Sequence, residues 1–187
     1  NGTNFNISQG DTDTSDFVFF HVRTDMMPST VTNLEIAGND ALCVPESPDF
    51  VTIIAPETEN GSRDYNQDGD TSDEVAFHFP ISNGAISTNP VLVGSTGNTV
   101  LQDCGTSVRY ISFAPEGTSP GFGDVNEDGD FDDYILTTIQ IRKSNGARIG
   151  FGIFGSVDTT VAENEFPQIL SNSVFAFPTN ESSIGSG

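Results

Sequence analysis

Two short windows of the chain carry side chains that could bind a metal ion. Both read D-x-N-x-D-G-D-x-x-D, and they lie 60 residues apart. The candidate ligands are Asp64, Asn66, Asp68, Asp70 and Asp73 in the first window, and Asp124, Asn126, Asp128, Asp130 and Asp133 in the second. In such a loop alternate side chains direct oxygens at one point, a glycine allows the sharp turn, and a later acid closes the shell. The spacing therefore predicts two loops that each hold one cation.

The ligand set favours calcium. Every candidate ligand is a hard oxygen, and neither Cys nor His lies inside a loop, which argues against zinc and redox metals. Magnesium retains its waters and demands octahedral geometry, so it fits the pattern less well. The alternative is a pair of Asx-rich turns with solvated acids, which the second full copy disfavours.

A third, degraded copy of the loop stands near the N-terminus. The stretch 13–16 reads DTSD, as does the stretch 70–73, but Ile7 and Gln9 occupy the positions of the early ligands. The remaining acids are Asp11, Asp13 and Asp16. They form a candidate for a third, degenerate calcium site.

The loops account for much of the net charge. The chain has 27 acidic and 6 basic residues, a formal charge of −21, and 14 of the acids lie within 57–74 and 116–133. Clustered like charges cost Coulomb energy unless a cation compensates them. A polyanion is repelled by phosphate backbones and anionic membranes, so nucleic-acid partners are excluded. No apolar run reaches the ~20 residues of a membrane span, so direct membrane insertion is not expected either.

Segments of alternating hydrophobicity flank the loops and predict half-buried strands. The expected strands are 51–57 and 110–116 before the loops, 74–79 and 134–141 after them, and 85–94 and 147–155 on the return. The sequence Ser-Asn-Gly-Ala at 82–85 and 144–147 predicts type I′ hairpin turns. Residues 17–22 resemble the strand after a loop, and residues 174–181 resemble the strand before one. No helical periodicity is evident.

These elements predict an all-β fold of tandem antiparallel repeats. Each repeat has about 60 residues and about four strands, the size of a propeller blade, with a calcium loop between strands. The expected divisions are a partial repeat at 1–46, full repeats at 47–106 and 107–165, and a partial repeat at 166–187.

The loop resembles the calcium loops of dockerins, thrombospondin type 3 repeats and integrin α propellers. It departs from an EF-hand because strands flank it and because Val75 and Ile135 stand at position 12. The whole repeats are similar to those of secreted bacterial calcium-loop β-repeat proteins, which are propeller-blade-like. That resemblance implies a calcium-binding protein located outside the cell or on its surface.

The partial repeats at the two ends are complementary. We therefore expect an extracellular structural protein that assembles with copies of itself, either head to tail by strand exchange or as a ring. A window from a longer array is the other interpretation of the ends. The alternative functions are a cell-surface adhesion or ligand-binding module and a non-catalytic module of a secreted hydrolase.

An enzyme is not expected. No nucleophile-elbow, zincin or P-loop motif occurs, and His21 and His78 stand at equivalent positions of the repeat, which indicates a structural role. The pairing of Cys43 and Cys104 stays open between an intrachain disulfide, an intersubunit bond and free thiols. Glycosylation sequons begin at Asn1, Asn6, Asn60 and Asn180.

Overall fold

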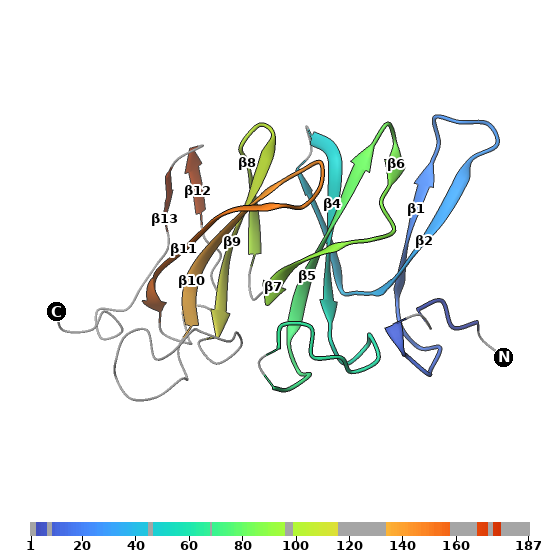
Figure 1. The fold of residues 1–187 in the computed structure, drawn as a ribbon, viewed down its shortest axis with the longest axis horizontal. Coiled ribbons are helices and arrows are strands. Elements are labelled where there is room, and N and C mark those ends of the chain that lie inside the picture. Colours follow the sequence, from blue (N-terminus) through green and yellow to red (C-terminus); the bar gives the residue numbers. More distant parts are fainter. Residues whose placement is uncertain are drawn as a thin grey trace. The chain divides into compact units, whose positions relative to one another are not determined.

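A computed structural model describes residues 3–6, 9–44, 47–67, 69–95, 99–115, 134–157, 168–171 and 174–176. Within these ranges the chain forms antiparallel sheets and contains no helix, which confirms the all-β prediction (Figure 1). None of the described residues belongs to a helix of the length and apolarity needed to cross a membrane.

The chain divides into two compact units. The first comprises Asn1–Tyr65, Gly69–Gly94 and Ser144–Gly146, and the second comprises Asn66–Asp68, Ser95–Lys143 and Ala147–Gly187. These bounds follow packing rather than sequence, so the expected repeat divisions remain a prediction.

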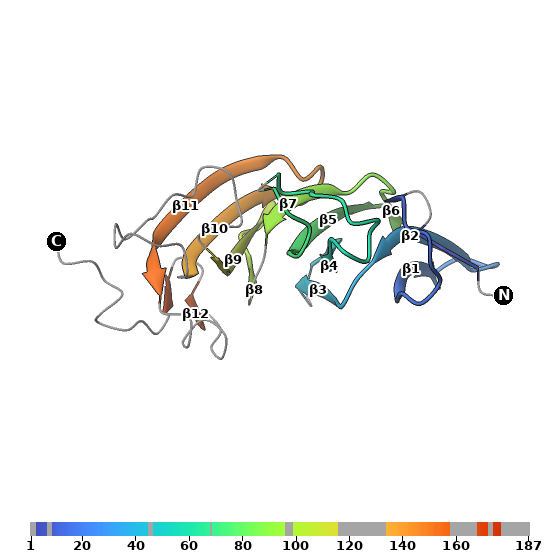
Figure 2. The ribbon, with the colours of Figure 1, turned by 90° about the horizontal axis from the view of Figure 1, so that it is seen from below.

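The first unit contains a two-stranded sheet and a five-stranded one. Its strands are β1 (Val18–Arg23), β2 (Thr30–Ala37), β3 (Asp40–Val44), β4 (Ser47–Pro56), β5 (Glu74–Ser82), β6 (Ala85–Ile86) and β7 (Val91–Ser95). Strands β1 and β2 form the small sheet, and β3-β4-β5-β6 is the order of the larger one, with β7 also paired to β5 (Figure 2).

The core of this unit lies where β2 meets the larger sheet. Leu34 and Ile36 of β2 are almost fully buried. They pack against the alternate side chains of β4 and β5, namely Ile53, Ala55, Val75, Phe77 and Phe79. Alternate side chains of β4 and β5 thus face this core, as the period-two pattern predicts. The opposite face of β5 is buried as well, with Ala76 and His78 both at 0% exposure, so the prediction of a half-buried strand is wrong there.

The Asn-Gly turn of the first unit is as expected. Asn83 and Gly84 have φ angles of 51° and 72°, and Ser82 pairs with Ala85, which is the geometry of a type I′ turn. The expected return strand 85–94 is split into β6 and β7. Pro90 stands at the break, and proline has no N–H to donate to a ladder.

The second unit is built on a four-stranded sheet of order β11-β10-β9-β8. Its strands are β8 (Thr99–Asp103), β9 (Ser107–Pro115), β10 (Tyr134–Arg142) and β11 (Arg148–Val157), and a separate hairpin pairs β12 (Gln168–Ser171) with β13 (Val174–Ala176). Ile111, Phe113 and Leu136 form its buried cluster.

The turn between β10 and β11 differs from the prediction. Only Gly146 has a positive φ, 66°, whereas Asn145 does not, so the turn is not type I′. The backbone bond from Arg142 N to Ala147 O closes a longer loop. Hairpin loops longer than two residues commonly end with a glycine in the left-handed region.

Candidate metal centre

Four of the ten ligands predicted for the two full loops can be located. The whole second loop, from Asp124 to Asp133, and Asp68 of the first loop lie outside the described residues. Asp64 and Asp70 are exposed, and Asn66 and Asp73 are half-buried. Their role as calcium ligands therefore stays a prediction.

The described part of the first loop is held by its own backbone. Gly69, at φ 109°, donates its N–H to the Asp64 carboxylate at 3.1 Å. The loop is closed at its base by the bond from Glu57 N to Asp73 O, 2.9 Å. The glycine at the sixth position thus makes the sharp turn that the motif requires.

The degraded loop near the N-terminus brings three acids together. Asp11, Asp13 and Asp16 each offer a carboxylate oxygen, and the three oxygens lie within 4.8 Å of one another. Asp11 is buried, Asp16 is half-buried and Asp13 is exposed. Among the described residues this is the only group of three or more acids, histidines or cysteines with such spacing, and it is compatible with a metal ion site.

Two asparagines orient the buried side of the cluster. The Asn4 amide donates to the carboxylate of Asp11 at 2.9 Å. The Asn6 amide donates to Asp16 at 3.2 Å and to the Glu59 carbonyl at 2.9 Å. Sequence reasoning missed both roles, since Asn6 attracted notice only as a sequon and its partner is 53 residues away.

The exposed side repeats the geometry of the first loop. Asp13 accepts hydrogen bonds from the Ser15 N–H at 2.8 Å and from its hydroxyl at 2.6 Å. Asp70 accepts the same pair from Ser72, at 2.8 and 2.7 Å. The two DTSD stretches therefore fold alike, and in each the bonds from the serine lower the pKa of the aspartate.

Segment 57–61 packs between β2 and residues 9–11, next to the cluster. Asn60 is fully buried; its carbonyl oxygen accepts from Ala37 N at 2.9 Å, and its amide donates to the carbonyls of Ala37 and Pro56. Gly61 packs so closely on residues 9–11 that a Cβ there would lie 2.4 Å from the Gln9 carbonyl oxygen. The acids are thus fixed from both sides.

Like charges dominate the electrostatics of the site. Burial raises the pKa of Asp16, and the carboxylates of Asp13 and Asp11 raise it further, against the opposing bond from Asn6. Burial also raises the pKa of Glu59, and the charge of Asp16 adds to that effect. The ion pairs of the described residues lie elsewhere, at Arg23–Asp25 and Lys143–Asp103. A cation at the cluster would relieve this repulsion.

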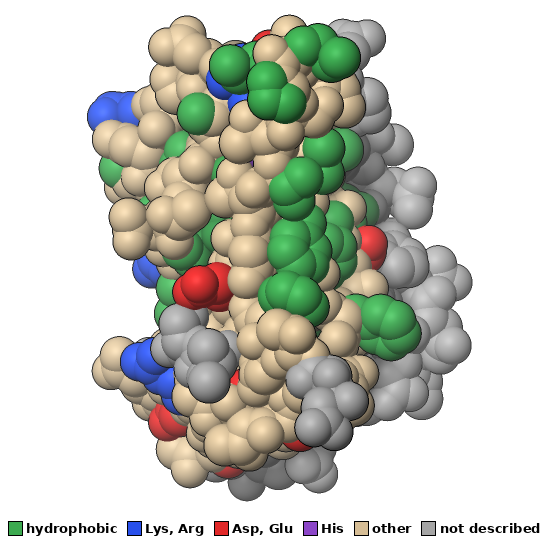
Figure 3. Space-filling model, turned by 90° about the vertical axis from the view of Figure 1, so that its right-hand side faces the viewer, with side chains coloured by type: hydrophobic (Ala, Val, Ile, Leu, Met, Phe, Trp, Pro, Cys, Tyr) green, Lys and Arg blue, Asp and Glu red, His purple; other side chains and the backbone are tan. Residues whose placement is uncertain are grey.

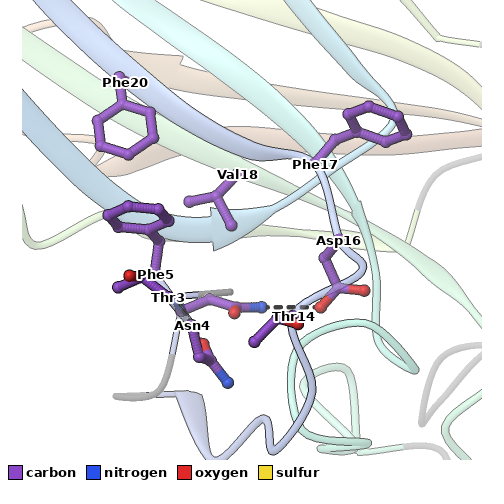
Figure 4. Close-up of a pocket in the computed structure, with 9 residues that line it drawn as sticks. Thr3, Asn4, Phe5, Thr14, Asp16, Phe17, Val18 and Phe20 are labelled. Atoms are coloured by element: carbon purple, nitrogen blue, oxygen red, sulfur yellow. Dashed lines mark hydrogen bonds between the residues drawn. The ribbon is translucent and has the colours of Figure 1, made fainter. Parts of the chain in front are cut away.

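A cavity of about 300 Å³ adjoins the cluster (Figure 4). Asp16 lies at one side of it, and the rings of Phe5 and Phe20 meet edge to face at the other, with centroids 5.3 Å apart. The ring of Phe17 lies on the same side as Asp16, so aromatic rings line the cavity at both sides and one carboxylate faces it.

The remaining candidate residues have structural environments. His78 is fully buried and stacks on Phe50, with ring centroids 5.0 Å apart, in keeping with the structural role expected for it. Cys43 is exposed, Cys104 is half-buried, and both thiols are free. Comparison with protein-family models, curated proteins and solved structures yields no match.

Proposed function

We propose that this chain is an extracellular calcium-binding structural protein that assembles with copies of itself. Its acidic loops bind Ca²⁺ between strands of antiparallel sheets, and the ions stabilise the strands that flank each loop. The observation that carries this proposal is the carboxylate cluster of Asp11, Asp13 and Asp16, set in a loop whose DTSD stretch folds like that of the first full motif.

The donor chemistry supports calcium over other ions. The side chains that converge at the cluster are carboxylates, with asparagine amides behind them, and a hard cation with flexible coordination suits such a set. We assign one ion each to the loops at 64–73 and 124–133, and a weaker one to the degenerate cluster, which lacks the early ligands of the motif. The protein is proposed to act by structure rather than by catalysis.

A calcium-dependent melting curve tests the proposal. Binding to the folded state alone stabilises by about 2.7 kcal/mol at 100 times Kd, so about 10 mM Ca²⁺ is expected to raise Tm by about 5–10 °C over EDTA for sites of sub-millimolar affinity. Calorimetric titration is expected to give two strong sites and one weaker site. A melting curve that calcium leaves unchanged would refute the calcium part of the proposal.

A matched pair of variants separates the cluster from general charge. Asp13→Asn combined with Asp16→Asn keeps the shape of both side chains and removes two charges, and it is expected to abolish the weakest site. The control Asp49→Asn removes an exposed charge from β4, away from the cluster, and is expected to leave all sites intact. Equal effects of the two changes would show that the cluster binds no ion.

A further inference from the structure

In each of the two large sheets, the strand before an acidic loop pairs with the strand after that loop. The register of this pairing is the same in both sheets. Pro56 at the end of β4 faces Glu74 at the start of β5, and Ala55 faces Val75. In the second unit Pro115 faces Tyr134, and the preceding residue, Ala114, faces Ile135. The proline therefore lies opposite the first residue after the last aspartate of the loop in both sheets.

Strand β1 follows an acidic loop in the same way but lacks the equivalent neighbour. It starts two residues after Asp16, as β5 starts just after Asp73, and among the described strands it pairs with β2 alone. Its other edge thus presents N–H and C=O groups to which no described strand is paired. Such an edge is a template for strand addition.

The face of β1 that corresponds to the core face of β5 is only partly covered, with the Phe5 ring against Phe20. Phe20 and Val22 align with Phe77 and Phe79 of β5; they are 43% and 49% exposed, whereas the β5 residues are 4% and 0% exposed. Val31 of β2, paired with Val22, is 62% exposed. Figure 3, which faces the β1 and β2 side of the molecule, shows hydrophobic side chains gathered in a column. In the larger sheet, side chains of a neighbouring sheet cover this face.

The sequence contains a strand suited to the open edge. Residues 174–178 read VFAFP, with a hydrophobic run ending in proline as in β4 and β9, and residues 174–176 form β13. Residues 166–180 carry no charged side chain, and neither do residues 17–22 of the acceptor. In a chain of charge −21 neither segment brings a charged side chain of its own into the pairing, a property that they share with residues 75–102.

We propose that a second copy of this chain adds its β13 strand, Val174–Ala176, to the open edge of β1. The register of the two observed sheets sets Phe175 of one copy opposite Phe20 of the other and Val174 opposite His21. This inference rests on the proposed function, which it deepens by naming the surface and the segment through which copies associate.

Disulfide trapping tests the register. Two proteins are made in a Cys43→Ser, Cys104→Ser background, one with Phe20→Cys and one with Phe175→Cys. When they are mixed at physiological salt and oxidised with copper phenanthroline, a disulfide-linked dimer is expected, at a yield at least several-fold above that of either protein alone. The matched control replaces Phe20→Cys by Asp49→Cys on an exposed site of β4, and is expected to give only the background yield.

Several outcomes would overturn the inference. The first is a yield of disulfide-linked dimer no higher than background when the Phe20→Cys and Phe175→Cys proteins are mixed. The second is an intrachain disulfide as the main product when one chain carries both substitutions. A third is a wild-type chain that sedimentation equilibrium shows to be monomeric at every concentration. Trapping is run in calcium and in EDTA, because the pairing itself needs no ion. If trapping fails but calcium still raises Tm, only this interface is rejected. If trapping succeeds but calcium leaves Tm unchanged, only the calcium part of the proposed function is rejected.

Discussion

At the scale of single residues, Asn60 belongs to a glycosylation sequon and also has a structural role in the fold. The sequence marks it as a glycosylation sequon, but in the fold it is fully buried and its amide forms three hydrogen bonds to backbone groups. A glycan on that nitrogen would require the site to open. Asn60 is therefore a residue that fixes segment 57–61 onto β2.

Replacing Asn60 should be costly. Asn60→Ala leaves the N–H and C=O of Ala37 buried without these bonds, so a loss of about 2–4 kcal/mol is expected from urea denaturation. Asn39→Ala is the control, since its amide donates at the surface to Glu74, and it is expected to cost less than about 1 kcal/mol. Similar losses in the two variants would contradict the assigned role.

The ion pair between Lys143 and Asp103 gives a prediction about pH. Their side chains are 5% and 37% exposed, and the hydrogen bond from Lys143, 2.8 Å long, lowers the pKa of Asp103. A carboxyl with a lowered folded pKa stabilises the fold above its unfolded pKa of about 3.9 and loses that contribution as the pH falls through the folded pKa. Asp103→Asn should therefore lower Tm most near neutral pH.

The measurement is the Tm difference between wild type and Asp103→Asn across the acid range. It is expected to shrink as the pH falls from about 5 to about 2, since the wild-type carboxyl is then protonated. The exposed pair of Arg23 and Asp25 supplies the control, Asp25→Asn, whose effect should be smaller throughout because solvent screens it. A difference that grows on acidification would contradict the assignment.

Spacing in the sequence was sufficient to single out Asp11, Asp13 and Asp16, because the acids of one short loop are local. It could not identify Asn6 or Asn60 as supports, because their partners lie 53 and 23 residues away. Local spacing thus predicts the acids, and tertiary packing supplies the groups that orient them.

At the scale of elements, alternation predicted the strands beside the loops but did not single out β2. That strand contains Glu35 at φ 58°, and the register shifts between Val18 and Phe20 of its partner. A bulge breaks the period-two pattern on which sequence reasoning depends. Strand β2 nevertheless supplies Leu34 and Ile36 to the core of its unit.

Segment 57–61 gives an element-scale prediction about packing. Gly61→Ala places a Cβ against the backbone of Gln9 and Gly10 at a φ of 74°, so about 2–4 kcal/mol of destabilisation is expected. Gly10→Ala is the control, because its φ is 89° and a Cβ there meets nothing within 4 Å, so only the backbone strain of about 1 kcal/mol applies. Urea midpoints compare the two, and equal shifts would show that the contact does not matter.

At the scale of the whole molecule, repulsion within a chain of charge −21 lowers the stability of the fold. More than half of the acids lie in the two windows around the full motifs, and the described cluster adds a third concentration of charge. Two bound calcium ions would reduce the formal charge to about −17. The metal-free fold therefore carries repulsion that both bound ions and dissolved salt can relieve.

Salt should consequently stabilise the metal-free protein more than the calcium-loaded one. Raising NaCl from about 0.1 M to about 1 M shortens the Debye length from about 10 Å to about 3 Å and screens repulsion between the acids. In EDTA we expect Tm to rise by several degrees, and in calcium by clearly less, since the bound ions already neutralise the loops. Tetramethylammonium chloride at the same concentrations is the control for specific sodium binding and should give the same rise. Equal increases of Tm with and without calcium would contradict this prediction. Salt would then be screening repulsion between acids outside the loops, which bound calcium does not neutralise.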